Sequence, residues 1–553
     1  MTTRAELVLG STSILPRLRT TAFGLLARIV CLAVLFALEI VAICAWFDPD
    51  LAYDDFRHWG AAILRFVVAS AVFLASVGYL KAKGPLQQIS ARCIGIPIAL
   101  RLLFAHFCAM AAFGFLSARL FRNHSLGLQT SLLAGGWFAL GILAIALAIF
   151  AFAPPKLWWG AFRATGNVWV YALFAGILAS LLGRASQFLW APATQLTFVL
   201  VEAVLRLFIT GTTADVGTST IGTPSFSVEI SPRCSGLEGA GLMIVMGVLW
   251  LWLFRRDFRF PRAFLLIPVG VGTLYLLNAL RIVALILIGN AGAPDIATRG
   301  FHSQAGWIAF NGVGLCLLVG APRISWLAAS GRAISIPETE SADPNAAYLM
   351  PLLAILVAAM ISRAASAQFE WLYPVRFFAA VAVLWHYRSE YTRLDWRFSW
   401  VSLLIGSAAF GMWLALDLML SKQSDNAGVG LTLALASRSA RISWITCRTL
   451  AAVITVPIAE ELAFRSFLMR RIVSPAFASV KGQSVTLLAV LISSIAFGVL
   501  HGDRWLAGMI AGLLYAFAFL RRGGKIGDAV AAHAMTNTML AGYVLLWGKW
   551  SLW

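Results

Sequence analysis

Long apolar runs alternate with short polar segments along the whole chain, and this pattern predicts membrane-spanning helices. Crossing a bilayer as an α-helix takes about 20 apolar residues. The runs show no strand-like alternation, and backbone polar groups in lipid must be paired within their own segment. We therefore predict an all-α, polytopic helical membrane protein with roughly 14 to 16 transmembrane segments. The clearest runs are 29–46, 60–80, 131–152, 240–254, 263–288 and 400–420.

One polar stretch, 323–345, interrupts the apolar pattern for longer than the other connecting segments do. It is rich in small and polar residues, including Glu338 and Glu340, and a new series of apolar runs follows it. We predict that this stretch links two helical bundles, formed by residues 1–322 and 346–553.

The composition and the charge distribution agree with a membrane protein. Only 12% of the 553 residues are charged and 60% are hydrophobic, whereas soluble globular proteins carry about 25% charged residues. The net charge of +19 would indicate nucleic-acid binding in a soluble protein. Here the arginines stand in short runs between apolar segments, as in 255–262, which is typical of cytoplasmic loops beside anionic lipid headgroups. We predict membrane lipids as partners, and no nucleic acid.

Three residues with reactive side chains are predicted to meet at one face of the membrane. Because 255–262 is predicted to be cytoplasmic, the span before it has its outer end next to Cys234. The span after it carries Arg281 in its outer part, and the exit loop of that span contains His302. Cys234 is also the one cysteine of seven that lies in a polar, turn-rich segment. We expect the thiol, the guanidinium and the imidazole to converge on the outer face.

These three residue types are suited to a site with a cysteine nucleophile. The thiolate is the attacking form of cysteine, and a nearby positive charge or a helix N-terminus lowers the thiol pKa. His302 would transfer protons, and Arg281 would stabilise the thiolate or an oxyanion. The alternative is that each residue is inert: a packed cysteine, a solvated histidine and an arginine that snorkels to the interface. Arg281 favours a site, because an ionisable residue inside an apolar run usually serves a function.

The motifs around these residues resemble the exosortase and archaeosortase family. They are Pro-Arg-Cys-Ser-Gly at 232–236, Asn-Ala-Leu-Arg at 278–281 and Phe-His-Ser-Gln-Ala-Gly at 301–306. The resemblance implies that Cys234, Arg281 and His302 are catalytic. Asn278 can add a hydrogen bond, but we assign it no role. The resemblance also implies that the partners are membrane-anchored precursor proteins with C-terminal sorting tails. The implied reaction is attack of the thiol on a backbone carbonyl, giving an acyl-enzyme that water or an acceptor nucleophile resolves.

A second group of polar residues lies in strongly apolar surroundings in the second half of the chain. Glu460 and Glu461 are adjacent, and two unpaired carboxylates in such a region would be costly. Arg465 follows Glu461 by one helical turn, where the two side chains can pair. Glu460 would then be left to act as a general base.

Histidine and asparagine side chains on later spans complete this second group. His501 ends one apolar run, and His533 and Asn537, four residues apart, share one helix face on another. Together with Glu460 these side chains can activate water directly, or Glu460, His501 and His533 can bind a metal ion, with zinc as the candidate cofactor. The alternative is a buried polar network that only joins helices.

The same residues resemble the CAAX protease and bacteriocin-processing family of intramembrane proteases. The family pattern is EExxxR, FxxxH and HxxxN, and the three motifs begin here at Glu460, Phe497 and His533. The resemblance implies that Glu460 activates water with the help of His501, while His533 and Asn537 stabilise the oxyanion or bind metal. The similarity spans roughly residues 444–546.

The two resemblances in one chain look like the fused exosortase–protease arrangement of the VPEID-CTERM system. This implies a multi-pass enzyme of the bacterial inner membrane whose thiol site faces the periplasm. A polytopic transporter is the alternative from another class, with the ionisable residues along an ion or substrate path. We favour the enzyme, because the two halves show no repeat relation to each other.

Overall fold

The structure is a computed structural model, and it describes seven continuous segments of the chain. They are 24–46, 79–94, 96–122, 128–231, 234–329, 344–420 and 427–553, to which single positions between 66 and 77 are added. The greater part of the predicted run 60–80 and of the predicted linker 323–345 lies outside the described residues, as do Pro232 and Arg233 of the first motif.

Helices form nearly all of the regular structure in the described segments. Ten of these helices are long and apolar enough to cross a membrane, or eleven if the bent pair Pro155–Thr165 and Val168–Leu181 forms one span. Four shorter apolar helices accompany them: Ala27–Phe36, Leu237–Leu253, Pro374–His386 and Leu487–Val499. The prediction of an all-α polytopic membrane protein is confirmed, and the higher number of spans stays a prediction.

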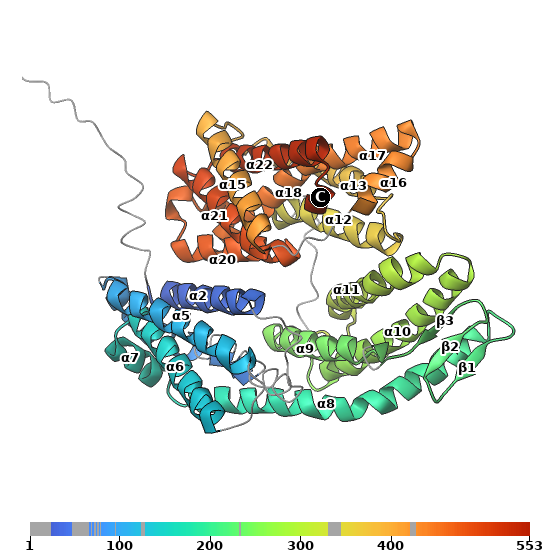
Figure 1. The fold of residues 1–553 in the computed structure, drawn as a ribbon, viewed down its shortest axis with the longest axis horizontal. Coiled ribbons are helices and arrows are strands. Elements are labelled where there is room, and N and C mark those ends of the chain that lie inside the picture. The colour runs from blue at the N-terminus through green and yellow to red at the C-terminus, as the bar shows by residue number, and fades with distance from the viewer. Residues whose placement is uncertain are drawn as a thin grey trace, which may run out of the picture. The chain divides into compact units, whose positions relative to one another are not determined.

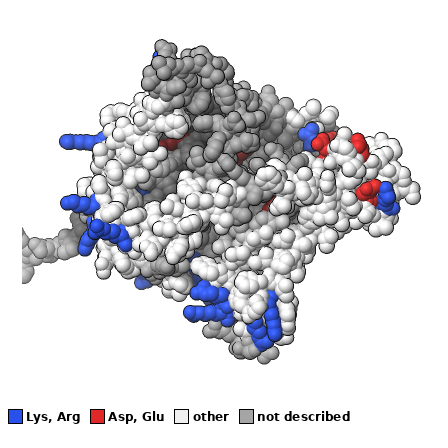
Figure 2. All heavy atoms as spheres, turned by 90° about the horizontal axis from the view of Figure 1, so that it is seen from below, with Lys and Arg blue, Asp and Glu red and all other residues white. Residues whose placement is uncertain are grey.

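The surface of the helices carries large apolar side chains that a soluble protein would bury. On α5 (Leu100–Arg122), Leu100 and Phe104 are each 72% exposed. Figure 2 shows charged side chains in a few small groups, with wide uncharged stretches between them. Such a surface is favourable against lipid hydrocarbon, because no backbone polar group of a helix needs water there.

The described helices pack into two compact units, each of which contains segments from both halves of the chain. Unit 1 comprises Met1–Arg184, Trp413–Leu420 and Leu468–Gly524. Unit 2 comprises Ala185–Met412, Ser421–Phe467 and Lys525–Trp553. Figure 1 allows the helices to be followed along the chain from blue to red. Each unit is described separately below.

Unit 1 consists of apolar helices that are joined by a few buried polar contacts. On α2, Arg28 donates to three backbone carbonyls, one at the end of α6 and two at the end of α4 and just after it. Glu39 of α2 pairs with Nε2 of His106 at 2.5 Å, and the other ring nitrogen lies 2.9 Å from the carbonyl of Ala144. Contacts of this kind join helices where the surroundings are apolar. The main helices are α2 (Leu25–Trp46), α4 (Tyr79–Ile94), α5, α6 (Leu128–Phe152), α7 (Pro155–Thr165), the first part of α8 (Val168–Leu205), α19 (Met469–Val473), α20 (Leu487–Val499) and α21 (Trp505–Arg521).

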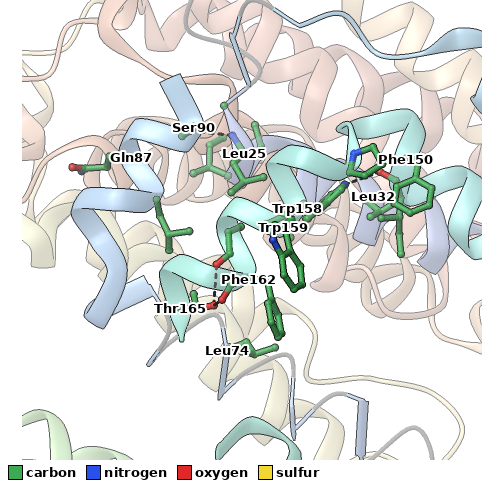
Figure 3. Close-up of a pocket in the computed structure, with 18 of the residues that line it drawn as sticks. Leu25, Leu32, Leu74, Gln87, Ser90, Phe150, Trp158, Trp159, Phe162 and Thr165 are labelled. Atoms are coloured by element: carbon green, nitrogen blue, oxygen red, sulfur yellow. Dashed lines mark hydrogen bonds between the residues drawn. The ribbon is translucent and has the colours of Figure 1, made fainter. Parts of the chain in front are cut away.

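A large apolar cavity lies among α2, α4, α7 and the start of α20 in unit 1 (Figure 3). Its volume is about 1360 Å³, and Trp158, Trp159 and Phe162 of α7 line it. The polar side chains on its wall, such as Gln87 and Ser90, are uncharged and not titratable. The cavity therefore suits a hydrocarbon chain and offers no group for acid–base chemistry.

Unit 2 holds eight of the nine residues that were predicted to form the two sites. Val201 of α8, Ile286 of α10, and Ile221 and Ile230 of the segment between α8 and α9 form a buried apolar cluster in this unit. The main helices are the last part of α8, α9 (Leu237–Leu253), α10 (Leu266–Asn290), α11 (His302–Gly320), α12 (Pro344–Ala364), α13 (Pro374–His386), most of α15 (Trp400–Leu420), α16 (Ala427–Leu435), α17 (Arg438–Leu450), α18 (Val456–Glu461) and α22 (Ile526–Trp547).

A small antiparallel sheet, which the hydrophobic pattern did not predict, lies between α8 and α9. Its strands are β1 (Thr213–Asp215), β2 (Thr220–Gly222) and β3 (Ser227–Glu229), in the order β1-β2-β3. Thr220 lies opposite both Asp215 and Glu229. The hairpin turn after β2 is anchored to the end of α10, because the hydroxyls of Thr223 and Ser225 both donate to Oδ1 of Asn290.

Candidate active sites

Cys234 lies in the turn between the small sheet and α9, directly before the helix begins. Gly236 holds a left-handed conformation, with φ of 83°, at the N-cap position of α9. A side chain at this position would be strained, and a Cβ here would come within 3.1 Å of the amide nitrogen of Asn278. The glycine therefore sets the sharp entry of the chain into the helix.

Arg281 and His302 come to Cys234 from two other elements of unit 2. Arg281 lies on α10, and its Nη1 donates to the backbone carbonyl of His302 at 3.4 Å. His302 is the first residue of α11, after a wide helical turn over Ile296–Phe301, so the predicted loop is mostly helical. Asn278, one turn before Arg281 on α10, donates its amide to the carbonyl of Cys234 at 2.9 Å. The predicted convergence of the thiol, guanidinium and imidazole is present in the structure.

The surroundings of Cys234 favour the thiolate. A hydrogen bond with the side chain of His302 lowers the pKa of the Cys234 thiol to about 7, although burial acts in the opposite direction. The Ser231 hydroxyl, 3.6 Å from the sulfur, and the charges of His302 and Arg281 lower this pKa further. A thiol with a pKa near 7 is about half ionised at neutral pH. Cys234 is therefore set up as a nucleophile.

Two buried hydrogen-bond donors beside the thiol have no partner among the described residues. They are Nε of Arg281 and the hydroxyl of Ser235. Buried polar groups are almost always hydrogen-bonded, and exceptions often mark sites that bind or react. A developing oxyanion is the kind of group that such donors stabilise.

Removing the imidazole should raise the pKa of the Cys234 thiol toward the ordinary value. In the wild type, we expect the alkylation rate of Cys234 to rise with pH through an inflection near 7, which follows the thiolate fraction. In His302→Ala the largest pKa-lowering interaction is lost, so the inflection should move up and the rate at pH 7 should fall about tenfold. The measurement is peptide mass spectrometry of the Cys234-containing peptide after timed iodoacetamide labelling.

The matched control for this experiment is Ser303→Ala, in the next residue of α11. The Ser303 hydroxyl donates only to carbonyls of the preceding turn. Its removal should leave the inflection near pH 7. An unchanged inflection in His302→Ala would show that the imidazole does not activate the thiol.

The second site is built on one apolar span, Arg438–Val473, and both adjacent glutamates lie in the part of this span that belongs to unit 2. Glu460 and Glu461 end the short α-helical turn α18, and wide π-helical turns precede and follow it. π-Helical turns are frequent at functional sites. Glu461 and Arg465 are both fully buried, and their carboxylate and Nε atoms are 3.1 Å apart. The predicted pairing of Glu461 with Arg465 is therefore present.

His533 on α22 connects the two glutamates. Its Nδ1 lies 2.9 Å from Oε1 of Glu461, and its Nε2 lies 3.9 Å from Oε2 of Glu460. The Glu460 oxygen is buried and has no hydrogen-bond partner among the described residues. The order Glu460, His533, Glu461, Arg465 alternates acidic and basic groups, an arrangement that lowers the cost of burying charge. It ends at Glu460, whose free oxygen is placed to accept a proton.

Asn537 and His501 form contacts that their sequence motifs did not predict. The Asn537 amide donates to the carbonyl of Ala452, in the π-helical turn before α18, at 2.8 Å. His501 belongs to unit 1, where its Nδ1 lies 2.8 Å from the carbonyl of Phe497 and its ring meets Trp413 edge-on. If Nδ1 carries the proton, Nε2 of His501 is left as an acceptor. Its joint action with Glu460 stays a prediction.

The donor set for a metal ion is incomplete in unit 2. Glu460 and His533 supply two candidate ligands there, whereas a catalytic zinc ion uses three protein ligands. Within the segments that the structure describes, no group of three or more His, Cys, Asp or Glu side chains is arranged to bind a metal ion.

Glu461 should contribute strongly to the free energy of unfolding, because the arginine that it pairs with is buried. Glu461→Gln leaves the buried Arg465 without its counter-charge, which should lower the free energy of unfolding by about 3–5 kcal/mol. Glu202→Gln is the matched control, because Glu202 forms the same i,i+4 pair with an exposed arginine, Arg206. The control should cost less than about 1 kcal/mol. Thermal unfolding of both variants in detergent checks this, and equal losses would contradict it.

Several residues of the first site carried little or no sequence signal. The Thr197 hydroxyl of α8 donates to the carbonyl of Ser235 and to the hydroxyl of Tyr275, which in turn donates to the carbonyl of Ala193. These bonds tie α8 and α10 to the cysteine turn. Threonine and tyrosine are common in apolar helices, so Thr197 and Tyr275 could not be recognised as site residues from the sequence. Asn278 could be considered, because it lies one helical turn before Arg281.

Two protein-family models match the chain. The model described as "Transmembrane exosortase (Exosortase_EpsH)" matches residues 102–320, which include Cys234, Arg281 and His302. The model described as "Type II CAAX prenyl endopeptidase Rce1-like" matches residues 442–539, which include the second site. Searches of curated proteins and of solved structures gave no significant match.

The helical membrane fold and the two matches define a class of protein, the membrane-embedded proteases. Within this class, the chain joins a region similar to transmembrane exosortases to a region similar to CAAX endopeptidases, and the resemblance that its motifs indicated is confirmed. The comparisons give no support to the transporter alternative.

Proposed function

We propose that the chain cleaves C-terminal sorting tails from membrane-anchored precursor proteins by means of Cys234. The observation that supports this best is the group of His302, Arg281 and Ser231 around Cys234, which brings the pKa of the thiol to about 7. An activated thiol at the end of an apolar helix lies where a precursor's backbone would emerge from its own membrane anchor.

The proposed reaction begins with attack of the Cys234 thiolate on a backbone carbonyl carbon. The carbonyl electron pair moves to oxygen, and Arg281 and Ser235, with their unpartnered donors, stabilise the oxyanion. When the C–N bond breaks, His302 protonates the leaving amine of the tail. The thioester that remains is then attacked by water or by an acceptor nucleophile, which restores the thiol.

The second half of the chain is proposed to be an intramembrane endopeptidase. Glu460 takes a proton from water, and the oxygen of that water attacks the substrate carbonyl. Glu461 orients His533 through its Nδ1, so that the ring faces Glu460 and can donate a proton to the oxyanion or the leaving amine. Asn537 fixes the π-helical turn that precedes the helix with the glutamates.

The domain boundaries and the location form part of the same proposal. Residues 1–322 would form the exosortase-like part, 323–345 the linker and 346–553 the endopeptidase part. The two family matches fall on either side of this linker. We place the protein in the bacterial inner membrane with Cys234 toward the periplasm, because the arginine-rich loop 255–262 is typical of the cytoplasmic side. The pairing of the two activities favours the VPEID-CTERM arrangement.

Co-expression with a candidate precursor tests the proposal. The precursor should carry a short motif, a transmembrane helix and a basic cluster at its C-terminus. The wild-type chain should convert it to a shorter form, and Cys234→Ala should not. Unchanged processing in both Cys234→Ala and Glu460→Ala would contradict the assignment of protease activity to these sites.

A further inference from the structure

Strand β3 is an edge strand, and one of its edges is not paired with another strand among the described residues. Cys234 follows this strand in the chain. Thr223 and Phe226 exchange both backbone hydrogen bonds at the hairpin turn. In an antiparallel pair, hydrogen-bonded and non-hydrogen-bonded positions alternate. Val228 is therefore bonded to β2, whereas the backbone N–H groups of Ser227 and Glu229 point away from it.

These outward groups are accessible. Ser227 and Glu229 are exposed, whereas Val228 is half-buried against the apolar cluster of unit 2. Among the described residues, no backbone or side-chain group accepts a hydrogen bond from the N–H of Ser227 or of Glu229. A free strand edge of this kind is a template for another extended chain.

The edge is followed in the chain by the turn that carries the thiol, and backbone hydrogen bonds hold the residues at both ends of this connection. The N–H of Ile230 bonds the carbonyl of Ser219, and the N–H of Cys234 bonds the carbonyl of Ser231. Glu229 and Cys234 are five positions apart in the sequence, which is at most about 17 Å of chain. A few residues of an added strand, at about 3.3 Å each, cover this distance.

We propose that the free edge of β3 binds an extended segment of the precursor by strand addition and so directs its backbone toward Cys234. This inference rests on the proposed cleavage of membrane-anchored precursors. The occupant is the stretch of the precursor that adjoins its membrane helix, because this stretch lies at the same membrane surface as the segment between α8 and α9. Backbone hydrogen bonds provide the affinity, as in other cases of strand addition.

Proline substitutions remove the outward N–H groups without removing a bond to β2. Ser227→Pro and Glu229→Pro should each lower the cleavage rate of a reconstituted precursor about three- to tenfold, the range for one lost hydrogen bond. Ser227→Ala and Glu229→Ala should cleave at close to the wild-type rate, because the backbone is the binding group.

The other edge of the sheet provides the matched control. Ile221 directs its backbone hydrogen bonds to Val228 of β3, so Ala214, which lies opposite Ile221, is at a non-hydrogen-bonded position of β1. The N–H of Ala214 therefore points away from β2, and the residue is exposed. Ala214→Pro should stay within twofold of the wild type. Equal rates in Ser227→Pro, Glu229→Pro and Ala214→Pro would overturn strand addition. A precursor that is cut equally by wild type and Cys234→Ala would contradict the proposed function instead.

Crosslinking gives a second test that does not depend on the proline variants. A cysteine introduced as Glu229→Cys, in a Cys234→Ala background, would be combined with precursors that carry one cysteine at successive positions. Strand addition predicts strong disulfide formation at every second precursor position, because side chains alternate between the two faces. Uniform crosslinking along the precursor would contradict the proposal.

Discussion

Cys234→Ala should abolish removal of the sorting tail, with a loss of at least about 10³-fold in rate. The reason is that the proposed acyl-enzyme forms on the Cys234 thiolate, and an alanine methyl group offers no nucleophile at this position. The expected result is accumulation of the full-length precursor in membranes that contain normal amounts of the variant. Gel mobility and mass spectrometry of the precursor measure this.

Cys234→Ser separates the chemistry from the packing at this position. The hydroxyl is close in size to the thiol, so the hydrogen bond from Asn278 to the backbone carbonyl of residue 234 should be kept. The turn before α9 should keep its conformation as well. A serine hydroxyl is a far weaker nucleophile than a half-ionised thiol. The serine variant should therefore fold like the wild type and still leave the precursor uncut. Wild-type cleavage by either variant would contradict the role of the thiol.

Glu460→Gln should stop the endopeptidase reaction of the second half while leaving the fold intact. General-base catalysis typically contributes 10²–10⁴-fold, and we expect a loss within this range. Oε2 of Glu460 has no hydrogen-bond partner among the described residues and lies 3.9 Å from Nε2 of His533. The isosteric amide therefore removes the charge opposite His533 but breaks no hydrogen bond of this oxygen. The measurement is cleavage of a membrane-anchored peptide with a CAAX-like end, together with a thermal unfolding curve.

The neighbouring residue gives the matched comparison for Glu460. Glu461→Gln introduces the same change one residue on, but it breaks the buried contact with Arg465. It should lower stability strongly, whereas Glu460→Gln should lower activity at nearly wild-type stability. If both variants lost stability equally, Glu460 would be a structural residue. If Glu460→Gln cleaved normally, the general base would have to be another group.

The sequence predicts the elements and local pairs of this protein better than its tertiary arrangement. The run 400–420 coincides with α15, because 20 apolar residues in lipid have few alternatives to a helix. The pairing of Glu461 with Arg465 was equally predictable, since it depends only on helical spacing. The meeting of Cys234, Arg281 and His302 followed from the order of spans and the position of one basic loop.

Features that depend on contacts between distant segments were not predictable. The strands β1 to β3 have three residues each, which is too short for an alternating pattern to stand out from a polar loop. The bond from Asn537 to the Ala452 carbonyl exists because a π-helical turn lies there, and no residue in that turn marks it in the sequence. The two compact units combine segments from both halves, which no local pattern encodes.

The most direct test of the central claim is the mass of the covalent intermediate. The purified full chain would be mixed with a precursor under acidic quench at short times, and the modified peptide would be located by mass spectrometry. The account predicts a thioester that joins Cys234 to the carbonyl end of the cleaved precursor, and no such adduct in Cys234→Ala. Cleavage without any adduct on Cys234, or an adduct on a different residue, would contradict it.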